Sequence, residues 1–201
     1  MMIRLPSYRN TSVKLLDETE DNAFAEVNFN HDDVLYRGIK LVEDEKGAYV
    51  KYPVRKRVKN GQPVFNRYGT QVEDYIFRPT ANDSEYYDTA IMNAYFRACK
   101  KGEIDMADIP FDDESRVVSV CRVNVPKRGI IGFAEIQYRG MMINDIAIVK
   151  AENGETFLVF PHYTEKKADG TEVKKLFIYP QKEELAKIKK LIFEEFNNLR
   201  I

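Results

Sequence analysis

Apolar and polar residues alternate in short runs along most of the chain. The segment at 24–30, Phe-Ala-Glu-Val-Asn-Phe-Asn, is a clear case. Alternation with a period of two is typical of strands that pack one face on a core, and turn residues such as Asn-His-Asp-Asp at 30–33 separate the runs. The pattern predicts a meander of short strands. The expected strands cover residues 12–17, 24–30, 34–43, 48–53, 76–79, 117–125, 130–138, 141–150, 156–161 and 174–179.

Two other segments place apolar residues three and four positions apart, which predicts helices. The first helix is expected to begin at Asp83 or Ser84 and to end near Ala98, with Lys100 and Lys101 at its negative end and Gly102 as the glycine that stops it. The second is expected to begin near Gln181. The side chains expected to face a sheet are Tyr87, Ile91, Ala94, Tyr95 and Ala98 in the first helix, and Leu185, Ile188, Leu191, Ile192, Phe196 and Leu199 in the second.

The elements occur twice in the same order. Phe-Ala-Glu-Val-Asn-Phe at 24–29 returns as Phe-Ala-Glu-Ile-Gln-Tyr at 133–138, which aligns Glu26 with Glu135. A period of roughly 100 residues is too long for a solenoid and indicates a duplicated domain. The predicted fold class is therefore α+β, with two tandem copies of a small antiparallel sheet followed by a C-terminal helix, packed as an intrachain pseudo-dimer. The boundaries are a first repeat at 11–101, an acidic linker at 102–115 and a second repeat at 116–201.

Composition supports a globular protein that does not cross a membrane. The chain of 201 residues is 44% hydrophobic and 31% charged, and no run approaches the roughly 18 apolar residues that a membrane span needs. The N-terminal residues lack the apolar run of a signal peptide, so we expect a cytoplasmic protein. The net charge of -1 excludes a globally basic nucleic-acid binder but leaves local patches open.

Catalytic and metal-binding signals are weak. The two histidines, His31 and His162, lie far apart and are expected to be exposed; Cys99 and Cys121 are expected to be small core residues. Neither pair forms a triad or a zinc motif, and the matching Glu26 and Glu135 are expected to face outward. No glycine loop of the phosphate-binding kind is present in the sequence. We therefore expect no enzymatic activity, no cofactor and no metal.

The candidate binding surface is a basic segment of the first repeat. From residue 46 to residue 72 the chain has seven Lys or Arg residues and no acidic residue, with aromatic residues between them. Basic side chains neutralise phosphates and exposed aromatic rings stack on unpaired bases. The alternative is a loop whose lysines only keep it soluble. The residues expected to bind nucleic acid here are Lys51, Tyr52, Arg55, Lys56, Arg57, Lys59, Arg67 and Tyr68.

The corresponding loop of the second repeat is a weaker candidate. Lys166, Lys167, Lys174 and Lys175 are the residues expected to bind there, but acidic residues lie among them. This dilution, the near-neutral net charge and six acidic residues in the linker favour a second hypothesis. The chain would then be a protein-interaction or scaffolding module that keeps the fold without binding nucleic acid.

The order of motifs resembles the SpoVG family, the stage V sporulation protein G or septation regulators of bacteria. The resemblance is closest from Ile-Asn-Asp-Ile-Ala-Ile-Val at 143–149, through the Asn-Gly turn and Tyr-Pro, to Phe-Glu-Glu-Phe at 193–196, and it covers 34–96 more loosely. It implies a sheet with one helix per copy, a homodimer whose sheets associate, and nucleic-acid binding in the regulation of septation, sporulation or gene expression. DNA and RNA are both open as partners.

The helix starts depart from the family pattern. The resemblance implies a basic residue near the helix N-terminus that takes part in nucleic-acid binding. The first copy has Asn-Asp-Ser-Glu at 82–85 with no basic residue, and the second has Lys182 followed by Glu183 and Glu184. The tandem arrangement itself predicts a monomer that acts as a pseudo-dimer, with further association left open.

Overall fold

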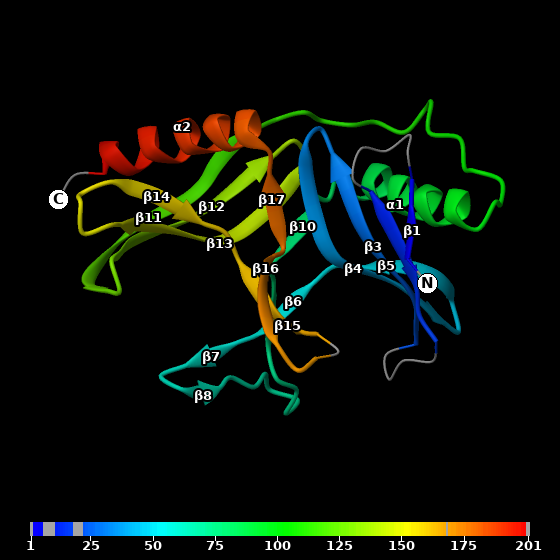
Figure 1. The fold of residues 1–201 in the computed structure, drawn as a ribbon, viewed down its shortest axis with the longest axis horizontal. Coiled ribbons are helices and arrows are strands. Elements are labelled where there is room, and N and C mark those ends of the chain that lie inside the picture. Colours follow the sequence, from blue (N-terminus) through cyan, green and yellow to red (C-terminus); the bar gives the residue numbers. More distant parts are fainter. Residues whose placement is uncertain (1, 6–10, 18–21, 168, 200–201) are drawn as a thin grey trace.

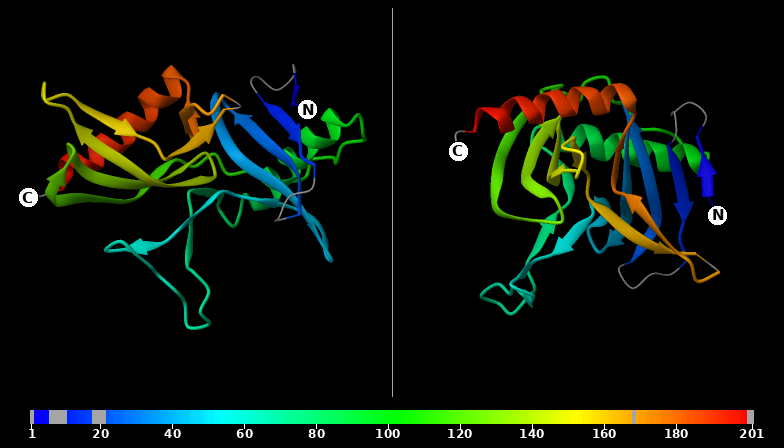
Figure 2. Two further views of the ribbon diagram at one scale, coloured as in Figure 1. Left: turned by 60° about the horizontal axis from the view of Figure 1, so that its bottom comes forward. Right: turned by 60° about the vertical axis from the view of Figure 1, so that its left-hand side comes forward.

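The computed structural model describes residues 2–5, 11–17, 22–167 and 169–199, and it shows an α+β fold in which mostly antiparallel sheets carry two helices (Figure 1). Each helix covers one face of one sheet, and hairpins extend from the other side (Figures 1 and 2). In chain order the elements are β1 (Met2–Arg4), β2 (Ser12–Leu15), β3 (Ala23–His31), β4 (Val34–Asp44), β5 (Gly47–Lys51), β6 (Val54–Lys56), β7 (Val58–Lys59), β8 (Gln62–Pro63), β9 (Glu73–Tyr75), β10 (Phe77–Pro79), α1 (Ser84–Ala98), β11 (Arg116–Lys127), β12 (Ile130–Tyr138), β13 (Met141–Lys150), β14 (Thr156–Val159), β15 (His162–Lys166), β16 (Glu172–Leu176), β17 (Ile178–Pro180) and α2 (Lys182–Asn198).

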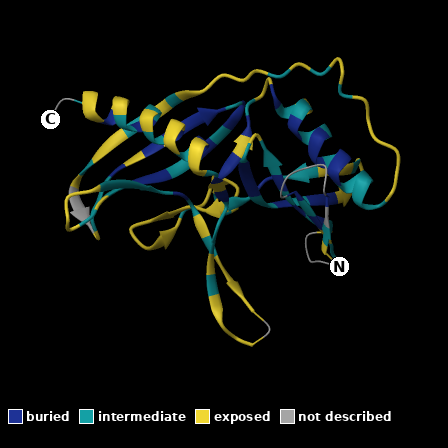
Figure 3. Ribbon diagram, turned by 45° about the horizontal axis from the view of Figure 1, so that its top comes forward, coloured by how far each residue is buried: buried dark blue, intermediate teal, exposed yellow. Residues whose placement is uncertain are grey.

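The predicted strands and both predicted helices are present with ends shifted by a few residues, except that the single strand expected at 174–179 is divided into β16 and β17, which belong to different sheets. The short strands β1, β6, β7, β8, β9 and β15 were not predicted, because two to five residues are too few for a periodic pattern. The helices bury the expected faces, as Figure 3 shows for the molecule as a whole. One exception is Glu184 of α2, a charged residue that is buried.

The two larger sheets exchange strands. The first sheet has the order β1-β2-β3-β4-β17, with β5 also paired to β4. The second has the order β10-β13-β12-β11, with β14 also paired to β13. Thus β17 of the second half completes the first sheet and β10 of the first half completes the second. Sequence periodicity did not predict this exchange, since it carries no information on which strand pairs with which.

The two exchanged strands have matching registers. Ile178 of β17 lies opposite Tyr36, and Phe77 of β10 lies opposite Ile143. The N–H of Arg37 donates to the carbonyl of Phe177 at 2.7 Å, just as the N–H of Asn144 donates to the carbonyl of Ile76 at 3.0 Å. The same backbone geometry therefore occurs at both junctions.

The registers also correct the sequence alignment of the two halves. Ser12 lies opposite Asn28 in the first sheet, and Ser119 lies opposite Glu135 in the second. The hairpin turns agree, since the positive φ angles at 32–33 recur at 139–140. The counterpart of Glu135 is therefore Asn28, and the expected match of Glu135 with Glu26 is wrong. A strand period of two hides a shift of two residues, because both alignments put the same side chains on the same face.

One hydrophobic core runs through both halves. The ring of Phe77, which belongs to the second sheet, lies 5.2 Å from the ring of Tyr36 in the first sheet, and both are fully buried. The hydroxyl of Tyr87 on α1 donates to the carbonyl of Arg139 at 2.5 Å. The core therefore holds the halves together as well as each sheet to its helix.

Polar groups at the junction form a compact cluster. Asp32 and Arg139 occupy equivalent turn positions, and the guanidinium of Arg139 pairs with the carboxylate of Asp32. Arg139 also lies 3.5 Å from the carboxylate of Glu184, which accepts a hydrogen bond from the hydroxyl of Tyr138. Burial, with that bond and the nearby negative charge, raises the pKa of Tyr138 to about 12. The other carboxylate oxygen of the buried Glu184 accepts a hydrogen bond from Nζ of Lys187 on the same helix at 2.7 Å, so both oxygens have a donor.

His31 is largely buried, contrary to the expectation of an exposed turn histidine. Its side chain is 13% exposed and its ring lies against Tyr87 and Phe111, with centroids 5.2 Å away in each case. Nε2 has no hydrogen-bond partner. Burial lowers the pKa of His31, and the positive charge of Arg139 acts in the same direction. The His31 side chain is covered because Phe111 of the linker packs against it, whereas the neighbouring Asp32 stays exposed.

The linker is irregular, as expected, and it is pinned to the first half. The side chain of Asn93 on α1 exchanges two hydrogen bonds of 2.8 Å with the backbone of Ile104. The ring of Phe111 stacks on Tyr86 at 4.4 Å, and the N–H of Asp112 donates to Asp83 at 2.7 Å. The carboxylate of Asp83 is therefore engaged with the linker and makes no capping bond to α1.

Two further expectations need correction. Cys121 is exposed on β11, so it is not a core residue, while Cys99 is half-buried. The helix α1 ends through Lys100, which has a φ of 55°, and Gly102 is not in the left-handed region. The N–H of Lys100 donates to the carbonyl of Arg97 at 3.1 Å and the N–H of Lys101 donates to the carbonyl of Phe96 at 2.8 Å, so the helix end is closed without a glycine.

The strand exchange predicts that neither half folds by itself. A fragment of residues 1–101 lacks β17 and a fragment of residues 102–201 lacks β10, so each sheet loses a strand and the shared core is opened. We expect each fragment alone to be unfolded or aggregated by circular dichroism, and a 1:1 complex when the two are coexpressed. A folded, monomeric single fragment would contradict this dependence.

The buried imidazole of His31 predicts a loss of stability in mild acid. Because its pKa is lowered on folding, the unfolded chain binds a proton below about pH 6.5 that the folded chain does not bind, so the free energy of unfolding falls as the pH falls below that value. Urea unfolding between pH 5 and pH 8 would measure this. We expect H31F to flatten the pH dependence and H162Q, at the exposed histidine, to leave it unchanged.

Candidate nucleic-acid interface

Two hairpins extend from the side of the sheets that faces away from the helices (Figures 1 and 2). We call residues 54–75 the first arm and residues 162–176 the second arm. The first arm is built from β6 paired with β9 and β7 paired with β8, followed by an isolated bridge between Phe65 and Gln71. The second arm is the hairpin of β15 and β16. The arms occupy corresponding places in the two halves.

Turn residues shape the first arm. Asn60 and Gly61, both with positive φ, close the β7–β8 hairpin, as an Asn-Gly turn favours. Further along, the side chain of Asn66 accepts hydrogen bonds from the backbone N–H groups of Tyr68 and Thr70 at 2.9 and 3.1 Å. These local bonds hold the end of the arm in a defined shape without a core beneath it.

The base of the first arm is neutralised by carboxylates. Arg57 forms two hydrogen bonds with Asp74 on the neighbouring strand, one of them 2.8 Å from Nε. Arg55 pairs with Asp145 of β13 at 2.5 Å. The hydrogen bonds and charge of Arg57 lower the pKa of Asp74, so this carboxylate stays ionised. A phosphate that binds Arg55 or Arg57 therefore has to compete with a carboxylate that is already paired with the arginine.

The end of the first arm has unpaired cations and exposed apolar groups. Within the described chain, Lys59 and Arg67 at this end contact no carboxylate, and neither does Lys56, which lies nearer the base on β6. Phe65 is 56% exposed and Tyr68 is 75% exposed, with the guanidinium of Arg67 4.7 Å from the ring centroid of Tyr68. This surface, which we call the arm tip, combines phosphate-binding charges with rings that bases can stack on.

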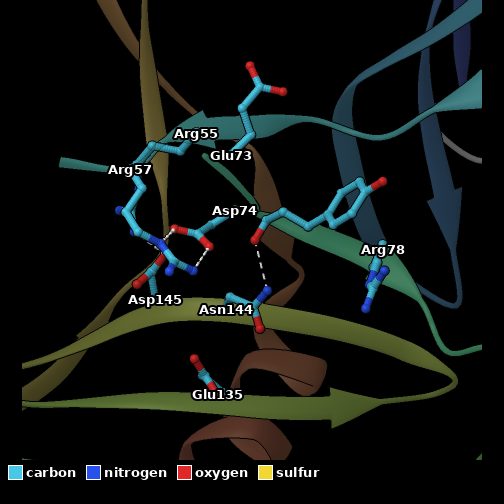
Figure 4. Close-up of a pocket in the computed structure, with 9 residues that line it drawn as sticks. Arg55, Arg57, Glu73, Asp74, Arg78, Glu135, Asn144 and Asp145 are labelled. Atoms are coloured by element: carbon cyan, nitrogen blue, oxygen red, sulfur yellow. Dashed lines mark hydrogen bonds and ion pairs between the residues drawn. The ribbon is translucent and has the colours of Figure 1, made fainter. Parts of the chain in front are cut away.

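A polar hollow of about 350 Å³ lies between the first arm and the second sheet (Figure 4). Arg55 and Arg57 reach into it from the arm, and Asn144 lies on the sheet, where its Nδ2 donates to the carbonyl of Tyr75 at 2.8 Å (Figure 4). Carboxylates also line the hollow, so its charge is mixed. The lining residues are Arg55, Arg57, Glu73, Asp74, Tyr75, Arg78, Glu135, Asn144 and Asp145.

Two predicted binding residues do not lie on the arm. Lys51 ends β5 and is half-buried. Tyr52 is 8% exposed, and its hydroxyl donates to Asp88 of α1 at 2.7 Å. Burial and the nearby carboxylate raise the pKa of Tyr52. A base-stacking role for Tyr52 does not fit this position, since its ring is part of the core.

The four lysines predicted in the second half all lie on the second arm. Lys166 is 3.7 Å from Glu172, and Lys175 pairs with Glu165, whose pKa is lowered by that bond. Lys167 and Lys174 are exposed. The registers of the two arms match: Tyr163 lies opposite Lys175 just as Arg55 lies opposite Asp74. Two residues further along, Glu165 therefore corresponds to Arg57, and the Glu165–Lys175 pair repeats the Arg57–Asp74 pair with the two charges reversed.

The structure adds three groups to this surface: Phe65, which was expected only as an aromatic residue among the basic ones, and Val58 and Arg78, which were not predicted. Phe65 and Val58 are exposed at the arm tip, and the guanidinium of Arg78 lies 4.8 Å from the ring centroid of the exposed Tyr75. The isolated basic residue inside the strand Phe-Arg-Pro was a usable signal for Arg78. Nothing in the sequence indicated that Val58 would be solvent-exposed.

The helix starts and the remaining polar groups add no second site. Lys182 and Glu183 are exposed at the start of α2, and Glu184 is buried. Among the described residues, no three His, Cys, Asp or Glu side chains are grouped so that they could hold a metal ion. Neither helix in the described part of the chain has the length and apolar character needed to cross a membrane.

Comparison of the chain with protein-family models, with curated proteins and with solved structures finds no significant match.

The ion pairs at the base of the first arm predict a gain-of-function variant. Replacing Asp74 and Asp145 by asparagine frees Arg57 and Arg55, so D74N/D145N should bind a labelled single-stranded oligonucleotide more tightly than the wild type. Two extra phosphate contacts would steepen the plot of log K against log salt by about 1.4. Fluorescence anisotropy at several salt concentrations would measure both effects.

The control is D108N/E152Q, which changes the net charge equally at two exposed carboxylates that pair with no described cation. An equal gain in both variants would mean that only the overall charge matters, and no gain in D74N/D145N would mean that the two arginines do not face a bound strand.

Proposed function

We propose that this protein is a non-enzymatic, nucleic-acid-binding regulator of the SpoVG type, acting in the bacterial cytoplasm in septation, sporulation or gene expression. The observation that carries the proposal is the arm tip, where, among the described residues, Lys59 and Arg67 have no carboxylate partner and Phe65 and Tyr68 are exposed; Lys56, nearer the base, is a third unpaired cation of the arm. A hairpin with cations and rings at its end suits a flexible, unpaired strand, whose backbone and bases are both accessible.

We also propose that the chain is a fused dimer of two copies of one unit. The matching registers of β10 and β17 support this, since a strand exchanged between identical subunits produces two such junctions. The contact between Asp32 and Arg139 also supports a fused dimer. In a homodimer the residues at these two equivalent positions would be identical and would carry the same charge, whereas a single fused chain can place opposite charges in contact.

In a fused dimer the two arms are free to diverge. The second arm pairs Lys166 and Lys175 with glutamates of the same hairpin, whereas three cations of the first arm remain unpaired. The first arm is therefore the principal contact surface and the second a weaker one.

The second candidate function is a protein-interaction module. The observation that favours it is the mixed charge of the hollow in Figure 4, where Arg55 and Arg57 already pair with carboxylates. Such a surface suits a protein partner that carries both signs of charge. In that case the arm tip would contribute apolar contacts and nucleic acid would bind weakly and without selectivity.

Fluorescence anisotropy with labelled single-stranded DNA, duplex DNA and RNA tests the proposal. We expect salt-sensitive binding by the wild type. We expect K56A/K59A/R67A to weaken it and to reduce the salt slope on single strands by about 2, which corresponds to three lost phosphate contacts. Y68A should weaken binding to single strands by about 1–3 kcal/mol and to duplex DNA much less.

The matched control is K101A/K189A/K190A; Lys189 and Lys190 lie on α2, on the opposite side of the sheets from the arm (Figure 1), and Lys101 is an exposed residue just after α1. It removes the same charge and should bind as the wild type does. Equal losses in the two triple variants would assign the binding to net charge alone. No binding of any probe by the wild type at low salt would refute the proposal and leave the protein-interaction module.

A further inference from the structure

The two halves differ at the outer edge of their sheets. In the first sheet the edge of β2 is covered by β1, with Ile3 opposite Val13. The equivalent strand of the second sheet is β11, because Ser12 and Ser119 occupy corresponding positions. Among the described residues, no strand pairs with β11 on the side away from β12. The second sheet therefore ends in an open edge where the first sheet has a partner strand.

The segment that could have covered this edge is used elsewhere. Just as β1 precedes β2, the linker precedes β11, but it packs on the first half through Phe111, Ile104 and Asp112. It approaches the second sheet only at its end, where Ser115 accepts a hydrogen bond from the N–H of Arg139. The fold thus leaves the edge open because the linker has to cross between the halves.

The open edge is long, and one regular run within it is unprotected. β11 has 12 residues, compared with three in β1. Natural edge strands are normally kept from pairing by short length, by charges, by proline or by β-bulges. In β11 the register with β12 shifts between Val117 and Ser119 and again between Arg122 and Lys127. The run between these irregularities at 119–121, Ser-Val-Cys, has no charge and no proline.

The backbone of Val120 points out of the open edge. In the first sheet the N–H of Leu5 donates to the carbonyl of Thr11, so by alternation Val13 is the next residue whose N–H and C=O face β1. Val120 is the counterpart of Val13. The position of Cys121 supports this, because its carbonyl oxygen points toward β12: a Cβ atom added to Gly132 of β12 would lie 2.5 Å from that oxygen. Neighbouring residues of a strand alternate, so Val120 points the other way. The donor and acceptor of Val120 are therefore available to another strand.

We propose that the β11 edge is the site where a second copy of this chain binds, through antiparallel pairing of the two β11 strands about a two-fold axis at Val120. The two second sheets then form one continuous sheet. Identical strands meet antiparallel under a two-fold axis, and they match in length and in twist. This interface does not depend on nucleic-acid binding.

The charges on β11 are compatible with this register. With Val120 opposite its own copy, Ser119 faces Cys121 and Val118 faces Arg122 of the partner strand. The guanidinium of Arg122 is drawn to α2, where it donates to the carbonyl of Phe196 at 3.1 Å and lies 4.4 Å from its ring centroid. Like charges are therefore not placed opposite each other near the axis.

The substitution V120P tests the pairing directly. Proline removes an N–H that the folded chain does not use, and it is tolerated on an edge strand when that N–H faces solvent. Light scattering coupled to size exclusion, without nucleic acid and at up to about 200 µM because a single strand pair is a small interface, would give the mass. We expect twice 23.4 kDa for the wild type and for V120T, and 23.4 kDa for V120P with an unchanged circular dichroism spectrum.

A cysteine variant gives a second readout that does not depend on proline being tolerated. Under mild oxidation, S119C should form an interchain disulfide with Cys121 of the other copy, since directly opposed residues have Cα atoms about 4.5–5.5 Å apart. The control S119C/C121S should form none. A wild type that is monomeric at every concentration, a V120P variant that remains dimeric, or equal crosslinking of the two cysteine variants would overturn the proposal.

Discussion

Each of the two larger sheets is completed by a strand that the other half of the chain supplies, and the rest of the structure depends on this exchange. β10 and β17 are only three residues long, yet each brings a fully buried residue, Phe77 or Ile178, to the junction. Their backbone hydrogen bonds satisfy the inner edges of β13 and β4. An arm precedes each exchanged strand and a helix follows it, so the positions of both depend on the half of the chain that pairs with the strand.

The fused dimer that we propose would let the two halves differ at the junction. In such a chain a change on one side of the junction does not appear on the other side. Asp32 against Arg139 uses this freedom, because two identical residues of either kind would repel each other at that position. The ion pairs of the two arms differ in the same way. The first strand of the arm carries the cation in Arg57–Asp74 and the anion in Glu165–Lys175, while the contact between the strands is the same.

The arms show why a count of basic residues overstates a binding surface. Of the cations in the first arm, Arg55 and Arg57 near the sheets are paired with carboxylates, whereas Lys59 and Arg67 toward the end, and Lys56 on β6, pair with none in the described chain. The position of the two arginines explains their pairing, since an arginine close to a sheet can reach acidic side chains on neighbouring strands, and among the described residues neither of the two larger sheets pairs with the end of the arm that carries Lys59 and Arg67. The same position, away from the larger sheets, leaves Phe65 and Tyr68 without a hydrophobic surface to cover them.

The sequence by itself determined the local structure of this protein. Periodicity of two or of three to four residues is a local property, so it placed the strands, the helices and their buried faces, and the repeated order of motifs indicated a duplication. It also located the basic segment of the first arm. What it could not determine is pairing between distant segments. The exchange of β10 and β17, the burial of His31 and Tyr52, the shift of Glu135 relative to Glu26 and the neutralisation of Arg55 by Asp145 all depend on contacts between residues far apart in the chain. Only the tertiary structure decided these, because a side chain's exposure and partner are set by what packs against it.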